Sequence, residues 1–152
     1  ETHQTNLLGW RIWAVIVGAM SAAQQAINGR LGVLLENTAQ AAFVSFFIGF
    51  LAIFIVSLFI DRRLPKISEL KKAKPWNGIG GFLGASFVFA TVVAVPQIGA
   101  GLTIMMGLIG QILGSMLVQQ FGWWRSSKYG IQIWQIVGII IMLTGIIFIK
   151  FL

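Results

Sequence analysis

The segment from Ala39 to Ile60 contains no charged residue, and this feature constrains the fold more than any other. A helix needs about 20 predominantly apolar residues to span the hydrocarbon core of a membrane. The whole chain is 57% apolar and 10% charged, whereas a soluble domain has about 25% charged residues. Because the chain lacks the polar surface to cover such a helix in water, we predict a membrane protein.

Four other segments are also apolar enough to cross the membrane. The five predicted spans are residues 12–35, 39–60, 76–95, 100–120 and 134–152. Charge and Pro65 end the second span, and Pro75 suits the first turn of the third. The run Pro96–Gly101 resembles a tight turn before the fourth span. Short connections indicate a single five-helix domain over residues 1–152, and therefore an all-α membrane protein.

The first span has the shortest apolar run, from Ile12 to Ala23. With Arg11 before it and small residues near its end, the run is also compatible with a secretory signal. The polar residues that follow suit the inside of a helix bundle better, so we favour a membrane span.

The basic residues indicate the orientation in the membrane. Nine of the eleven fall on one side of five alternating spans. These nine are Arg11, Arg62, Arg63, Lys66, Lys71, Lys72, Lys74, Arg125 and Lys128, and only Arg30 and Lys150 fall on the other side. The positive-inside rule then puts the N-terminus in the cytoplasm and the C-terminus outside. This explains the basic composition without nucleic acid as a partner, and the longest basic loop suits contact with anionic membrane lipid.

The remaining chemistry excludes most enzymes. The chain has no Cys, and its only His is His3. Its four acidic residues are Glu1, Glu36, Asp61 and Glu69, and none lies in the middle of a span. We therefore expect no catalytic residues, no metal site and no cofactor.

The polar groups inside the spans are amides and hydroxyls, which are costly in lipid and either join helices or mark a pathway. Ser21, Gln24 and Asn28 share one face of the first span by helical spacing. We predict that Gln24, Asn28 and Gln111 line a cavity and contact a polar small-molecule solute. Further residues predicted to lie behind them are Gln25, Ser45, Thr91 and Ser115. The alternative is that these amides only form hydrogen bonds between helices.

Small and aromatic residues also recur at helical spacing along the predicted spans. Glycine pairs such as Gly80 with Gly84, and Gly110 with Gly114, favour close packing of helices. The phenylalanines of the second span, which begin at Phe43, are spaced along one side. Contact with lipid is the simpler interpretation of this stripe, and an aromatic cavity wall is the alternative.

Several segments in order resemble a known family. They are residues 24–32 (QQAINGRLG), 42–49 (AFVSFFIG), 75–84 (PWNGIGGFLG), 95–99 (VPQIG), Gly110-Gln111, and Gly138 with Gly145. Together they are similar to the YdcZ-like family of small five-helix inner-membrane proteins in the drug/metabolite transporter superfamily. The resemblance covers nearly the whole chain.

The resemblance implies half of a ten-helix, inverted-repeat transporter in a bacterial inner membrane, with the site near the midplane. It also implies that Gly138 and Gly145 form a dimer interface in the last span. In related four-helix transporters a glutamate of the first helix binds cation and proton in turn. This chain has Gln24, Gln25 and Asn28 in that region, so proton coupling through a mid-membrane carboxylate does not carry over.

A five-span partner that is inverted relative to this chain must have its N-terminus outside, because the N-terminus of this chain is predicted to lie in the cytoplasm. The bias of nine basic residues against two opposes insertion of this chain in both orientations. We therefore favour a heterodimer with an oppositely oriented five-helix protein over an antiparallel homodimer. The expected function is a secondary transporter subunit that exports a small solute by alternating access. The alternative is a membrane scaffold or accessory subunit that transports nothing.

Overall fold

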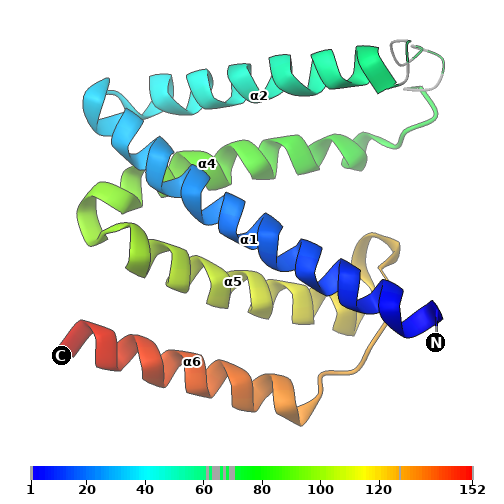
Figure 1. Ribbon diagram of the computed structural model, residues 1–152, viewed down its shortest axis with the longest axis vertical. Coiled ribbons are helices and arrows are strands. Elements are labelled where there is room, and N and C mark those ends of the chain that lie inside the picture. Colours follow the sequence, from blue (N-terminus) through cyan, green and yellow to red (C-terminus); the bar gives the residue numbers. More distant parts are fainter. Residues whose placement is uncertain are drawn as a thin grey trace. The chain divides into compact units, whose positions relative to one another are not determined.

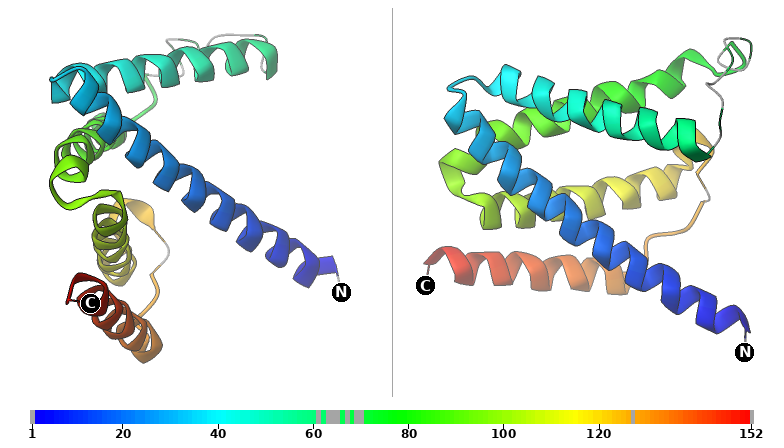
Figure 2. Two further views of the ribbon diagram at one scale, coloured as in Figure 1. Left: turned by 60° about the vertical axis from the view of Figure 1, so that its left-hand side comes forward. Right: turned by 45° about the horizontal axis from the view of Figure 1, so that its top comes forward.

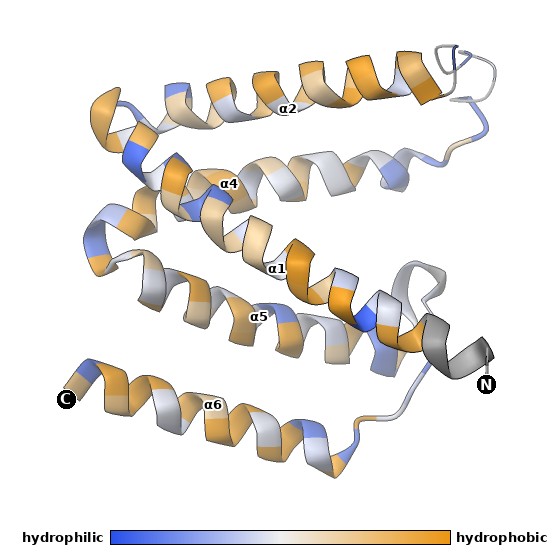
Figure 3. Ribbon diagram, in the orientation of Figure 1, coloured by the Kyte–Doolittle hydropathy of each residue, from blue (hydrophilic) through white to orange (hydrophobic). Residues whose placement is uncertain are grey.

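The computed structural model describes residues 2–60, 62, 66, 68, 71–126 and 128–151, and all regular elements in these ranges are helices (Figure 1). They are α1 (Thr2–Leu34), α2 (Thr38–Ile60), η1 (Pro75–Gly78), α4 (Ile79–Ile98), α5 (Ala100–Phe121), η2 (Trp123–Arg125) and α6 (Ile133–Phe151). Five stretches are helical, long and apolar enough to cross a membrane, which confirms the predicted all-α, five-helix fold. Apolar residues colour most of α2 and α6 in Figure 3.

The helices extend beyond two of the predicted span limits. The first stretch suited to crossing the membrane begins at Leu7 rather than at residue 12, because apolar residues continue on the N-terminal side of Arg11. The turn predicted from Pro96 is wrong, since Pro96 lies inside α4. Its fixed φ suits a helix, and its missing N–H costs one helical hydrogen bond, to the Val92 carbonyl. The chain breaks instead at Gly99, whose φ of 84° is readily adopted by glycine.

A local cap separates α1 from α2. Glu36 has a φ of 50°, which turns the chain after α1. The Asn37 side chain then accepts a hydrogen bond from the Gln40 N–H at 3.0 Å. An Asn in this position satisfies one of the free N–H groups at the start of a helix. The two helices can therefore lie close together on a short connection.

The chain divides into two compact units, Glu1–Ala100 and Gly101–Leu152. In the first unit, α1, α2 and α4 each contact the other two. The core of this unit is formed by Ala41, Ala42, Val88 and Val92, with Leu31 packed against it. Figure 2 shows that the C-terminal half of α1 crosses α4, whereas its N-terminal half extends away from α2 and α4.

In the second unit, α5 and α6 run in opposite directions. The connection folds back on the end of α5, because the Tyr129 N–H donates to the Gln119 carbonyl at 3.3 Å. The Ile131 N–H donates to Oε1 of Gln120 at 3.2 Å. Each helix of this unit has two buried apolar residues spaced seven apart, and therefore on one face. These are Ile109 and Met116 on α5, and Ile139 and Ile146 on α6.

Candidate functional site

The face of α1 that meets α4 is marked by two glycines. A Cβ placed on Gly29 would lie 2.6 Å from Cβ of Val95, and one on Gly32 would overlap Cγ1 of Val92. Ordinary contacts between carbon atoms are about 3.5–4.0 Å. Only glycine therefore lets the two backbones approach this closely. The close packing expected of glycines occurs at these two positions of α1, whereas a Cβ on Gly80, Gly84, Gly110 or Gly114 would meet no described atom within 4 Å.

Two amides share this face of α1. Gln25 and Asn28 precede Gly29 and Gly32 in an i, i+3, i+4, i+7 pattern, which places all four on one side of the helix. The Gln25 side chain is 6% exposed and the Asn28 side chain 5% exposed. Oε1 of Gln25 is fully buried and has no hydrogen-bond partner among the described residues. A buried acceptor without a donor is unfavourable, so this atom is a candidate contact for a bound molecule.

Thr91 of α4 is the third buried polar residue of the first unit. It is 5% exposed and lies between Val88 and Val92 on the buried side of α4. Its hydroxyl donates to the Val88 carbonyl at 2.9 Å. The proton of Thr91 is therefore used locally, while the lone pairs of Oγ1 can still accept a hydrogen bond.

The structure thus buries Gln25, Asn28 and Thr91 in one unit. Gln24 is exposed, and Ser45 of α2 is half-buried. Gln24 lies about 100° around α1 from Gln25, away from the face that carries the glycines. Sequence spacing alone grouped Gln24 with Asn28, whereas burial pairs Asn28 with Gln25. The solute contacts assigned to these residues stay predictions.

The other predicted site residues belong to the second unit. Gln111 and Ser115 are exposed on α5, and the Ser115 hydroxyl donates to the Ile112 carbonyl at 2.8 Å. Gly138 is half-buried and Gly145 exposed on α6. A Cβ on either glycine would meet no described atom within 4 Å. This face of α6 has room for a neighbour, and its role in a dimer stays a prediction.

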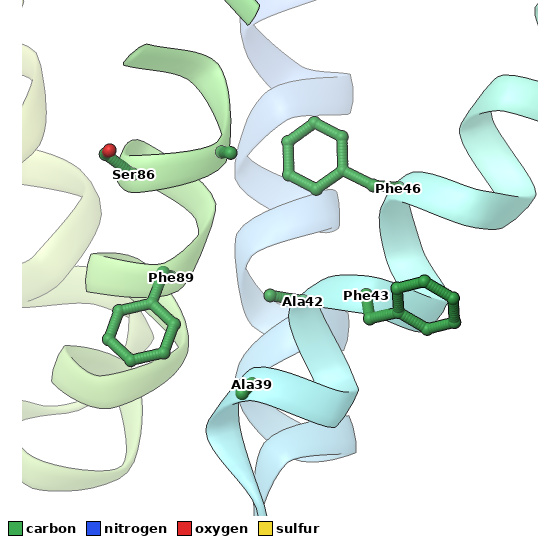
Figure 4. A pocket seen from close by; sticks show the side chains of 7 residues that line it. Ala39, Ala42, Phe43, Phe46, Ser86 and Phe89 are labelled. Atoms are coloured by element: carbon green, nitrogen blue, oxygen red, sulfur yellow. The ribbon is translucent and has the colours of Figure 1, made fainter. Parts of the chain in front are cut away.

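A pocket of about 510 Å³ lies between α2 and α4 (Figure 4). It is lined by Ala39, Ala42, Phe43, Phe46, Ala85, Ser86 and Phe89. The hydroxyl of Ser86 donates to the Phe82 carbonyl at 2.9 Å, so the wall offers no free donor. The pocket can take an apolar group of the size of a small-molecule ligand.

Sequence reasoning missed most of this pocket. Phe43 was singled out as part of a phenylalanine stripe that continues to Phe47, and Ala42 and Ser86 were noted only as a small and a polar residue of their spans. These two rings stack with centroids 6.0 Å apart, but Phe47 does not line the pocket. The informative signal was the series Ala39, Ala42, Phe43 and Phe46, whose spacing places small and aromatic residues on one helical face.

Comparison with known proteins gives one family. The family model described as "Putative inner membrane exporter, YdcZ" matches residues 9–148. The comparisons with curated proteins and with solved structures gave no match.

Proposed function

Because the chain belongs to the YdcZ family of inner-membrane exporters, we propose that it is one subunit of a secondary transporter that moves a small solute by alternating access. The family match makes it a membrane transporter protein rather than an enzyme. The observation that carries the proposal is the unpartnered, buried Oε1 of Gln25 where α1 packs on α4. A helix crossing that contains buried amides can bind a polar molecule if the two helices separate during the cycle.

The proposed transporter is a dimer of two five-helix subunits related by an inverted repeat. This chain, as one subunit, supplies the faces of α1 and α4, and the opposite subunit would close the site near the membrane midplane. Nine of the eleven basic residues lie on one predicted side, which supports an N-terminus in the cytoplasm and a C-terminus outside. It also supports a different, oppositely oriented protein as the partner. The faces around Gly138 and Gly145 on α6 are our candidates for the contact between units.

A scaffold that transports nothing is the second candidate function. It is favoured by the tight packing of Gly29 on Val95 and of Gly32 on Val92. Tight crossings of this kind stabilise membrane helices whether or not they move. The two candidates differ in one measurable property, which is solute flux.

The test is flux into proteoliposomes that contain the chain with its membrane partner. The solute panel should include amines, amino acids, sugars and guanidino compounds, each with and without a proton gradient. The proposal expects saturable flux of at least one solute. The triple variant Gln24→Ala, Asn28→Ala, Gln111→Ala should lose this flux while remaining folded. Normal flux in the folded triple variant would refute this set of contacts, and no flux of any solute in the wild type would favour the scaffold.

A further inference from the structure

The buried polar residues of α1 and α4 differ in what they offer a ligand. Gln25 contributes a buried carbonyl oxygen that has no donor among the described residues. Thr91 contributes only acceptor lone pairs, because its proton is held by the Val88 carbonyl. Asn28, on the same face of α1, adds an amide that can both donate and accept. The buried side-chain atom that lacks a partner among the described residues is the Gln25 acceptor, so the ligand group that meets it must bring an N–H or O–H.

The lack of buried charged side chains further limits the class of ligand. The described parts of α1, α2 and α4 bury no acidic and no basic side chain. A cation placed at this crossing would lose its water without gaining a counter-charge, which is strongly unfavourable in an apolar medium. An uncharged donor loses less hydration and needs only a hydrogen-bond acceptor. The crossing thus favours neutral donors over ammonium and guanidinium ions.

We infer that Gln25, rather than its exposed neighbour Gln24, is the group at which a neutral solute with N–H or O–H donors binds. This inference rests on the proposed transport function, which it makes specific in residue and in solute chemistry. Since the Gln25 oxygen is inaccessible in the structure, the helices packed on this face of α1 must move away from it before a solute or water reaches it. The side chain is therefore buried in one state of the cycle and hydrated in another.

The absence of cysteine from the chain makes a direct test available. Gln25→Cys, made in the full chain in membrane vesicles, gives a protein with a single thiol. A thiol reacts with water-soluble methanethiosulfonate reagents as the thiolate, which forms only where water reaches it. Ile109→Cys, at a position on α5 that is 6% exposed and lies outside the α1–α4 crossing, is the packed control. Val17→Cys, on the exposed part of α1, is the control for a side chain that faces lipid.

We expect the thiol of the Gln25→Cys variant to react about tenfold faster than the thiol of either control variant, because only the first is hydrated during the cycle. The Gln25→Cys variant lacks the amide acceptor, so the solute chemistry is tested by protein-dependent flux through the wild type. Acetamide, which has N–H donors, should be transported. N,N-Dimethylacetamide, which has no donor, and methylammonium, which is charged, should not.

If the Gln25→Cys variant reacts as slowly as the Ile109→Cys variant, the inference is overturned, even if wild-type vesicles transport a solute. Equal flux of acetamide and N,N-dimethylacetamide through the wild type would overturn the assigned solute chemistry.

A second pair of variants keeps the test independent of the thiol. Gln25→Met retains the length of the side chain but removes the acceptor, and Gln24→Met is its matched control. We expect acetamide flux to fall in the Gln25 variant and to persist in the Gln24 variant. The opposite result would also overturn the inference, whereas failure of the proposed function would appear as absent flux in the wild type.

Discussion

The packing of α1 on α4 predicts a large effect for a small substitution, Gly29→Ala. The added Cβ would lie 2.6 Å from Cβ of Val95, which is about 1 Å short of an ordinary carbon contact. Val95 cannot move aside easily, because β-branched side chains in helices have one strongly preferred rotamer. The backbones must therefore separate, and overpacking of this kind costs about 1–3 kcal/mol.

The higher helix propensity of Ala raises the stability of the variant, so this gain has to be subtracted by means of a control variant. Ala is favoured over Gly inside a helix by up to about 1 kcal/mol. Gly18→Ala gains the same propensity but meets no described atom within 4 Å. The difference between the two variants therefore isolates the clash. Because the clash needs the Cβ atoms of both residues, Gly29→Ala should cost less in a Val95→Gly background than in the wild type.

The assay is the free energy of unfolding in mixed micelles, measured by titration with a denaturing detergent. Gly29→Ala should be less stable than Gly18→Ala by about 1–3 kcal/mol. Equal stability of the two variants would refute the reasoning, since α1 would then not meet α4 at Gly29. A full loss that Val95→Gly fails to reduce would show that a different neighbour is responsible.

The remaining predictions concern α4, α6 and the orientation of the chain. Thr91→Val removes only a bond to the Val88 carbonyl, so the unfolding free energy should fall by less than about 1.5 kcal/mol; a larger loss would mean that Thr91 bonds to another helix. Gly138→Leu combined with Gly145→Leu should abolish cross-linking between subunits, whereas Gly49→Leu on α2 should preserve it; intact cross-linking in the double variant would exclude this face of α6. Reporters fused to both termini should give one orientation, with the N-terminus in the cytoplasm; equal populations would contradict the heterodimer.

The sequence predicted the helices well because one physical rule dominates them. In lipid the backbone N–H and C=O groups of such a segment must form hydrogen bonds within the segment, so a long apolar run forms a helix. The second span, 39–60, matches α2 closely, since Asn37 and the charged loop bound it. The end of α4 was less predictable. Pro96 resembled a helix stop, but its fixed φ suits a helix and the loss of one hydrogen bond does not end α4 there; Gly99 makes the turn.

The candidate site was only partly predictable, because periodicity gives faces without saying which face meets a neighbour. Gln24 with Asn28, and Gln25 with Gly29, were two equally regular patterns on α1. The choice between them depends on the position of α4, which Val92 and Val95 fix by contact with Gly32 and Gly29. No local rule in the sequence specifies that pairing.

Counterflow is the measurement that tests the transport claim most directly. Proteoliposomes are loaded with unlabelled solute, and uptake of the labelled solute from outside is followed over time. A carrier that alternates between two sides exchanges the two pools, so the account predicts a transient accumulation of label above its equilibrium level. Steady equilibration without accumulation would indicate an open pore, and no uptake of any solute would indicate a scaffold; either result would contradict alternating access.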